Sequence, residues 1–247
     1  MRAFAVALAA FLVCAGAGVA QSVVPITSEP SHHFALENTY VRVFDVTAAP
    51  HATTLVHQHD HDYLFVTLGD ADITSARHDV PPAHLVLRDG SVEYAAGGFA
   101  HAVTNNLDRP FHNITIEILE PSTHVHACGE HCTSLRACTP HHGCVTESRP
   151  FTADQWVARS ITLDPGADWE MNAATGPALV VVVSEADLAL HGPHASTAAA
   201  HRPAGNLIWI PRVSHEGPTA HASVRNTGTA PARLVVLELR GSGVRGS

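Results

Sequence analysis

The sequence lacks the short motifs that mark several large enzyme classes. It contains no nucleophile elbow, no phosphate-binding loop and no dinucleotide fingerprint. These absences argue against covalent catalysis by serine or cysteine. Convincing helical periodicity is missing as well, so the chain is not expected to fold as a helical protein.

Positive charge is scarce. The 247 residues include 14 Lys and Arg against 23 Asp and Glu, which gives a formal net charge of −9. This balance argues against nucleic acid or an anionic membrane surface as a partner. Histidine, in contrast, is abundant, with 20 residues, and this abundance favours a role in metal handling.

A long apolar run occurs at the N-terminus, where residues 1–20 carry an early positive charge, an apolar run to Val13 and small residues up to Ala20. This order is typical of a secretory signal peptide cut after Ala20, and the run is too short for a membrane-spanning helix. Cys14 as a lipoprotein cysteine is disfavoured, because the bulky Val13 precedes it. We expect a periplasmic or secreted protein whose metal is loaded outside the cytosol, with no membrane contact after cleavage.

Cysteine is sparse and clustered. Cleavage after Ala20 would leave four of the five cysteines, namely Cys128, Cys132, Cys138 and Cys144. An even number in an oxidising compartment favours two disulfides, with three possible pairings. The neighbouring histidines, such as His124 and His126, raise the alternative of a zinc or copper(I) site. The cysteine spacings do not match the usual zinc-finger pattern, so disulfides are the preferred interpretation.

Short strand-like patterns bounded by turn residues make up most of the remaining sequence. They cover residues 40–46, 63–68, 84–87, 111–119, 160–163, 179–183, 206–210 and 233–239. Many short strands at regular spacing are typical of a β-sandwich or barrel.

The two halves of the chain resemble each other. Residues 65–73 align with 180–188 once a gap of one residue is allowed, and 111–119 resembles 232–239, which indicates an internal duplication. We predict a signal peptide (1–20), an N-terminal barrel (21–120), a Cys- and His-rich linker (121–150), a C-terminal barrel (151–240) and a flexible tail (241–247).

Two segments of the first half carry a possible metal site. In the first, side chains two apart in an extended strand point to one face, so His57 and His59 can present both imidazoles to one ion. In the second, Gly97 and Gly98 precede His101, which can supply a third imidazole from another strand. Neutral imidazoles with one carboxylate suit a divalent first-row metal and leave positions open.

These segments resemble the two motifs of the cupin family. The first motif is matched by His57, His59, Asp62 and Gly69, and the second by Gly97, Gly98, His101 and Asn105. The resemblance implies an all-β fold of two cupin-type double-stranded β-helix (jelly-roll) barrels, a metal held by His57, His59 and His101, and pairing of two copies into a homodimer.

The fourth metal ligand is less well defined by the resemblance. Asp62 stands where the family usually has a Glu, and it follows the His-x-His segment after two residues instead of three or four. His61 is the competing candidate if the strand stays regular. Copper, zinc, manganese and iron are the candidate metals. Affinity order favours copper or zinc, and a carboxylate ligand with open positions keeps manganese plausible.

The second half lacks a matching metal motif. The same alignment places Asn172 and Ala174 opposite His57 and His59, so we expect a degenerate second barrel. A weaker site formed by His215, Glu216 and His221 is the alternative.

The family resemblance implies dioxygenase, isomerase or decarboxylase chemistry on a small molecule, and no catalytic residue is assigned. The alternatives are a non-catalytic metal- or ligand-binding protein and a barrel that serves only in structure or assembly. Near the motifs, Tyr63, Phe65 and Phe99 are candidate pocket residues, although strand aromatics are more often core. Arg77, His78 and Arg88 are candidate anion-binding residues, and a solvated strand face is the preferred interpretation for them.

Overall fold

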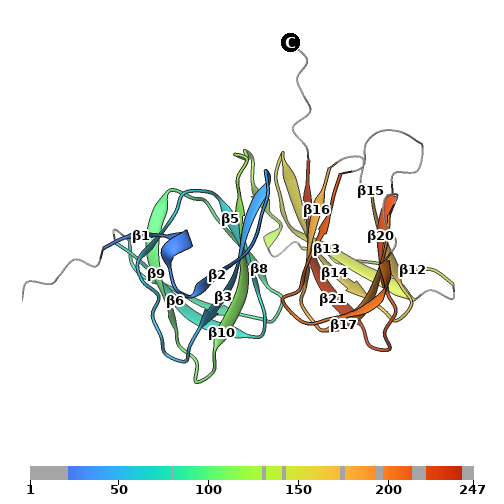
Figure 1. Ribbon diagram of the computed structural model, residues 1–247, viewed down its shortest axis with the longest axis horizontal. Coiled ribbons are helices and arrows are strands. Elements are labelled where there is room, and N and C mark those ends of the chain that lie inside the picture. The colour runs from blue at the N-terminus through green and yellow to red at the C-terminus, as the bar shows by residue number, and fades with distance from the viewer. Residues whose placement is uncertain are drawn as a thin grey trace, which may run out of the picture.

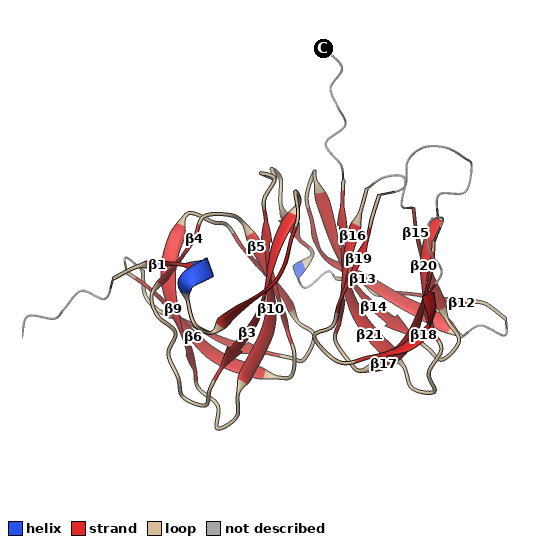
Figure 2. Ribbon diagram, viewed as in Figure 1, coloured by secondary structure: helices blue, strands red, loops and turns tan. Residues whose placement is uncertain are grey.

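The computed structural model describes residues 22–240 with gaps at 79, 130–131, 141–142, 173–175, 193–196 and 213–220. The predicted signal peptide, the tail at 241–247, and Ala174, His215 and Glu216 lie outside the described residues. Apart from 3-10 turns at Ile26–Ser28 (η1) and at Gly129, the regular structure of the described chain is β-strand (Figure 2). Among the described residues there is no helix with the length and apolar character needed to cross a membrane.

The first barrel is built from two five-stranded sheets (Figure 1). One sheet has the order β1 (Val24–Pro25), β4 (His57–His59), β9 (Phe99–Asn105), β6 (Ala71–Arg77) and β7 (Ala83–Leu87). The facing sheet has the order β2 (His32–Glu37), β3 (Val41–Ala48), β10 (Phe111–Ile118), β5 (Tyr63–Thr67) and β8 (Val92–Ala95).

The second barrel repeats this plan beside the first. Its larger sheet has the order β11 (His126–Ala127), β13 (Cys144–Thr152), β14 (Trp156–Leu163), β21 (Ala232–Leu239), β16 (Ala178–Val182) and β19 (Leu207–Ile210), with β12 (Leu135–Cys138) paired to β13. Its smaller sheet has the order β15 (Asp168–Asn172), β20 (His221–Asn226), β17 (Ala186–His191) and β18 (Thr197–Arg202). The predicted all-β fold of two jelly-roll barrels is thereby confirmed.

Strand β10 shows how the sequence positions the interior of the first barrel. Its isoleucines, such as Ile114 and Ile116, belong to the core between the barrels, whereas the alternate residues Asn113, Thr115 and Glu117 are buried polar side chains. Because side chains alternate across a strand, the polar set points to the other face, into the first barrel. The interior of the first barrel therefore contains several buried polar side chains.

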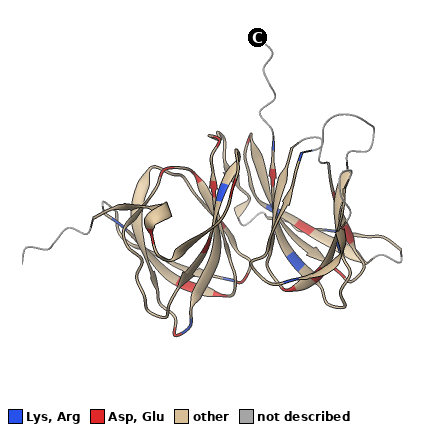
Figure 3. Cartoon of the chain, viewed as in Figure 1, with Lys and Arg blue, Asp and Glu red and all other residues tan. Residues whose placement is uncertain are grey.

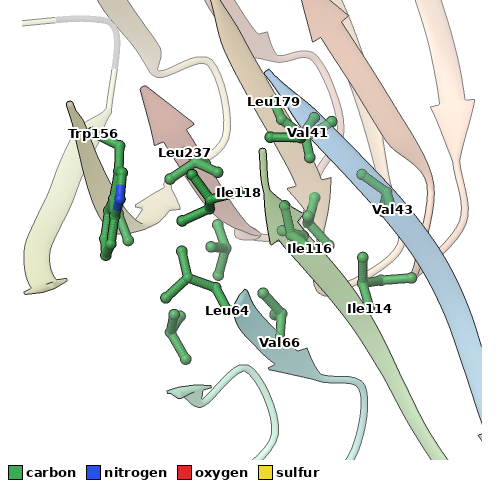
Figure 4. Packing of buried hydrophobic residues seen from close by; sticks show 14 of the residues in the cluster. Val41, Val43, Leu64, Val66, Ile114, Ile116, Ile118, Trp156, Leu179 and Leu237 are labelled. Carbon is green, nitrogen blue, oxygen red and sulfur yellow. The ribbon is translucent and has the colours of Figure 1, made fainter. Parts of the chain in front are cut away.

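The two barrels share one hydrophobic core. Leu64 and Ile116 of the first barrel belong to the same buried cluster as Trp156, Leu179 and Leu237 of the second (Figure 4). Two sheets therefore pack face to face across the boundary. At its edge, Arg233 forms an ion pair with Asp89 at 2.6 Å.

The internal duplication is visible in matching hydrogen bonds. Asn105 ends β9, and its Nδ2 donates to the carbonyl of Arg109 at 2.8 Å. Asn226 ends β20 and donates in the same way to Ala230 at 2.8 Å. Both asparagines are fully buried. Each one therefore closes the turn that follows its strand.

The segment 121–150, expected to be a linker, contributes strands to the second barrel. Strand β12 pairs with β13, and β13 continues the larger sheet through β14. The two predicted disulfides are present and join neighbouring cysteines, Cys128 to Cys132 and Cys138 to Cys144. The second disulfide joins the end of β12 to the start of β13 where the register already places these residues opposite each other.

Candidate metal centre

Three histidines predicted from the sequence lie together inside the first barrel. Strand β4 pairs with β9 so that His57 is opposite His101. The ring centroids are 4.6 Å apart for His57 and His101, and 5.1 Å from each of these rings to His59. The exposed fractions are only 1%, 1% and 6% for His57, His59 and His101. The alternation of strand side chains thus gathers three imidazoles on one buried face.

A fourth histidine, His32 of β2, completes the group from the facing sheet. Its ring centroid lies 4.7 Å from that of His57 and 6.4 Å from that of His59. One ring nitrogen from each of these three residues lies within 4.8 Å of the other two. Sequence reasoning missed His32, because it lies outside both motifs and reaches the site only through the packing of two sheets.

The outer nitrogens of three of these rings are held by hydrogen-bond partners. The Nδ1 atom of His57 lies 3.0 Å from the carbonyl oxygen of Leu55, and that of His101 lies 2.9 Å from Ser75 Oγ. The Nδ1 atom of His32 lies 2.7 Å from a carboxylate oxygen of Glu29. This pattern leaves Nε2 as the nitrogen available to an ion, and metal-ligating histidines are typically oriented in this way.

Glu29 is the buried carboxylate behind His32. It has an exposed fraction of 3% and also accepts hydrogen bonds from the backbone N–H groups of Ser31 and Leu55. Burial alone would raise the pKa of Glu29, but the hydrogen bond and charge of His32 and these N–H groups outweigh burial and lower it. Glu29 is therefore an ionised group that orients His32.

A second buried carboxylate, Glu117, lies behind His59. Its Oε1 is 3.7 Å from His59 Nδ1, and its other oxygen accepts a hydrogen bond from Arg42 at 3.3 Å. Sequence reasoning also missed Glu117. The sequence feature that could have identified Glu117 is its position in β10, where it alternates with isoleucines in a strand whose two faces are both buried.

Burial keeps the imidazoles of His57, His59 and His101 neutral. It lowers the pKa of His57 to about 4 and that of His101 to about 2, with the neighbouring histidines adding to the effect. Burial also lowers the pKa of His59. Neutral imidazole is the form that binds metal ions, so the residues are in their ligating form at neutral pH.

The donor groups of this cluster fit a divalent cation. His57 Nε2, His59 Nδ1 and Glu117 Oε1 are buried and have no hydrogen-bond partner among the described residues. Each such group costs roughly 1–3 kcal/mol when it stays unpaired. A cation held by the imidazoles would give His57 Nε2 a partner, and the buried carboxylates Glu29 and Glu117 would balance its charge.

Asp62, the expected fourth ligand, occupies a different position. Its two carboxylate oxygens accept hydrogen bonds from Tyr94 Oη at 2.7 Å and from the Gly97 N–H at 2.9 Å. Strand β4 ends at His59, so the regular alternation that would have aligned His61 stops before it. The sequence predicted Asp62 as the fourth metal ligand. In the structure both of its carboxylate oxygens instead accept hydrogen bonds within the turn beside the site.

The glycine pair of the second motif is part of the same turn. A Cβ atom on Gly97 would collide with the backbone of His61, and Gly98 has a φ of +84°, which favours glycine. The N–H of Gly98 donates to the carbonyl of His59 at 2.7 Å. Both glycines therefore hold the chain after β4 against the start of β9.

The histidine cluster opens into a cavity of about 290 Å³ inside the first barrel. The cavity is lined by the four histidines and by the three aromatic residues noted in the sequence, Tyr63, Phe65 and Phe99. Tyr63 stacks on His59 with ring centroids 4.0 Å apart. Two further charged residues, Arg77 and Glu93, also line it.

The corresponding position in the second barrel is apolar. The register pairs Met171 with Ala222, four residues before Asn226, as it pairs His57 with His101, four residues before Asn105. Met171 therefore occupies the position in the second barrel that His57 occupies in the first. The sequence alignment had assigned this position to Asn172, one residue further along the chain. Met171 and Ala222 belong to the buried hydrophobic cluster of this barrel. Within the described residues, His32, His57 and His59 form the only His, Cys, Asp and Glu group of metal-binding geometry.

Solved structures with the same architecture support this description of the fold. AerE from Microcystis aeruginosa has a TM-score of 0.56 at 12% identity, over 85% of this chain and 98% of that chain. The formate complex of oxalate decarboxylase from Lactobacillus farciminis has a TM-score of 0.56 at 12% identity, over 85% and 84%. Vicilin from Solanum lycopersicum has a TM-score of 0.56 at 12% identity, over 83% and 76%.

Oxalate decarboxylase and vicilin are cupin-fold proteins, so the chain has the cupin fold. At these identities the likeness extends to the fold alone. No protein-family model matches the sequence, and a search of curated proteins finds no match.

Proposed function

We propose that the protein is an exported enzyme that holds one divalent transition metal in its first barrel and acts on a small molecule. The observation that carries the proposal is the group of four histidines, of which His57, His59 and His101 are buried and kept neutral, and which opens directly into a cavity. His32, His57, His59 and His101 would hold the metal. The second barrel, with Met171 and Ala222 at the matching position, would be a degenerate, structural domain.

The donor set favours particular metals. Because the carboxylate of Asp62 is engaged by Tyr94 and Gly97, the ligands are imidazole nitrogens, which suit copper, zinc or iron better than manganese. Oxalate decarboxylase from Bacillus subtilis, a protein of the same fold, has Mn(II) centres. That protein keeps manganese among the metals to be tested.

When bound, such a metal supplies Lewis-acid or redox chemistry to a ligand in the cavity, which fits dioxygenase, isomerase or decarboxylase activity. The residues of the chain have separate tasks. Glu29 orients His32 through a hydrogen bond, Glu117 places a carboxylate 3.7 Å from His59, and Tyr63 covers one face of His59. The aromatic and aliphatic lining excludes water from the ligand.

The alternative is a non-catalytic protein that binds metal or a small ligand. Exposed histidines of the segment before the second barrel, including His124 and His126, would then add weaker sites. The cavity beside the cluster favours the enzyme, because a metal carrier needs no enclosed space next to its ion. Export to the periplasm or medium is part of the same proposal, and the two disulfides are compatible with it.

Elemental analysis of the mature protein purified from its native compartment tests the proposal. We expect one equivalent of a single metal in the wild type, loss of most of it in His57→Ala and His101→Ala, and full retention in His191→Ala, whose side chain is exposed on β17. Several equivalents that survive the first two changes would identify a metal carrier. Absence of metal from the wild type would contradict a metal site.

A further inference from the structure

The cavity beside the histidine cluster contains one permanent positive charge, and this inference rests on the proposed function for the metal next to it. Arg77 ends β6 and is paired in register with His101 of β9. Cross-strand partners in adjacent strands direct their side chains to the same face, so Arg77 points to the side of the sheet that carries the histidines. Its side chain is exposed at the mouth and lines the cavity.

The guanidinium of Arg77 is stacked on an aromatic ring. Its central carbon lies 3.9 Å from the ring centroid of Phe99, which also lines the cavity. Stacking occupies the flat face of a guanidinium and leaves the N–H groups, which lie in its plane, free to bind an anion. Among the residues that the structure describes, no carboxylate forms an ion pair with Arg77.

From this geometry we propose that Arg77 binds the carboxylate of the ligand, and that the ligand is a small organic acid with an apolar body. The rest of the lining fits the apolar body, because Phe65, Ile73, Leu85, Val103 and Phe111 all face the cavity. A planar fork of donors matches a carboxylate in a bidentate manner. The acid would lie between Arg77 and the histidine cluster.

Glu93 is the other charged residue in the lining, and it comes from β8 in the facing sheet. Its carboxyl group makes no hydrogen bond with a described residue, and burial raises its pKa, which favours the neutral form. Arginine stays charged at every accessible pH. An anionic ligand therefore meets a fixed cation on one side and a weakened negative charge on the other.

The test compares salicylate with its uncharged analogue salicylamide on the metal-loaded protein by titration calorimetry. We expect Arg77→Gln to weaken salicylate binding at least about tenfold, which corresponds to about 1.4 kcal/mol. Salicylamide binding should stay unchanged. Arg77→Lys should retain part of the salicylate affinity, because it keeps the charge and loses the fork.

Arg88→Gln is the matched control. Arg88 is exposed, lies 3.6 Å from Asp70 and is not part of the cavity lining, so its loss should leave both affinities unchanged. Glu93→Gln should not weaken salicylate binding. Unchanged salicylate affinity in Arg77→Gln, equal losses for salicylamide, or the absence of saturable salicylate binding by the wild type would overturn the assignment.

Metal content measured on the same samples separates this inference from the proposed function. If the wild type contains no metal, and Arg77→Gln still binds salicylate more weakly than the wild type, the metal site is contradicted and the anion site is supported. If both proteins contain one equivalent of metal and bind salicylate with equal affinity, the metal site is supported and the anion site is contradicted.

Discussion

The carboxylate of Glu29 and the imidazole of His32 form a buried pair, with 2.7 Å between Oε2 and Nδ1 and side-chain exposures of 2% and 5%. The pair joins a residue that follows the short 3-10 turn to the first residue of β2. Neither residue belongs to the motifs by which the site was predicted. In this pair the carboxylate of Glu29 is placed to orient His32 as a metal ligand.

Glu29→Gln should therefore lower metal affinity while the three other histidines remain in place. The amide keeps the shape of the side chain but removes the negative charge that strengthens His32 as a ligand. We expect a loss of about 10–100-fold, measured by competition with a chromophoric chelator. Glu37→Gln is the control, because Glu37 is exposed and pairs with Arg42 away from the cluster. Equal affinities in the two variants would contradict the role of Glu29.

Asp62→Ala separates a turn-holding role from a ligand role. The methyl group accepts neither the hydrogen bond of Tyr94 nor that of Gly97, so both bonds are lost. We expect destabilisation of about 1–2 kcal/mol in urea unfolding and retention of the full equivalent of metal. If the metal is lost while stability is unchanged, Asp62 is a ligand after all.

Acid should destabilise the metal-free protein within a defined window. The pKa of His57 is about 4 in the folded protein and 6.5 for the unperturbed side chain. Above pH 6.5 both states are neutral at this residue. As the pH falls toward 4 the unfolded chain gains the proton first, which favours unfolding by up to about 3 kcal/mol.

Urea unfolding at pH 7.5, 6 and 5 in the presence of chelator measures this slope. Replacement of His57 by Gln removes the titrating group, and the variant should lose stability less steeply over the same range. A wild type with the same stability at pH 7.5 and pH 5 would show that the imidazole is not held neutral in the folded state.

The shared core predicts that the barrels unfold together. Leu179 is fully buried in the cluster between the barrels, so Leu179→Ala should cost about 2–5 kcal/mol. Arg233→Gln removes the half-exposed ion pair with Asp89 and the hydrogen bond to the Asp89 carbonyl, and we expect a loss of at most about 1 kcal/mol.

The two barrels can be followed separately in this experiment. All three tryptophans, Trp156, Trp169 and Trp209, lie in the second half of the chain, so their fluorescence reports on that barrel and, through Trp156, on the core that it shares with the first. Circular dichroism reports on both. The two transitions should coincide in the wild type and in both variants, and a separate first transition by circular dichroism would mean that the barrels unfold independently.

Much of the fold could be predicted from the sequence because the duplication is regular. The alignment of Phe65 with Val180 is confirmed by pairing, since Phe65 is opposite the fifth residue of β10 and Val180 opposite the fifth residue of β21. Ile73 and Leu188 likewise stand opposite Asn105 and Asn226. Alternation in β4 was sufficient to place His57 and His59 on one face.

The alignment failed where loop length differs between the halves. Eight positions separate His57 from Phe65, whereas nine separate Met171 from Val180, so a constant offset shifts β15 by one residue. A shift of one residue exchanges the two faces of a strand. The offset therefore assigned Asn172 to the position that the register gives to Met171.

The remaining site residues depend on contacts between sheets, which periodicity does not encode. His32 and Glu117 belong to the sheet that faces β4, and no spacing rule relates them to the His-x-His motif. Asp62 was misplaced for the opposite reason. It is near the motif in sequence, but the chain turns after His59 and brings its carboxylate to Tyr94.

The first strand of the described chain has a practical consequence for any recombinant version of this protein. Strand β1 pairs in parallel with the His57–His59 strand, and Ile26 of the following turn is buried. A purification tag fused close to Val24, or a start site chosen downstream of His32, would disturb or delete one side of the centre. A preparation made in that way would look well folded and still give a misleadingly low metal content, so the tag belongs at the other end of the chain.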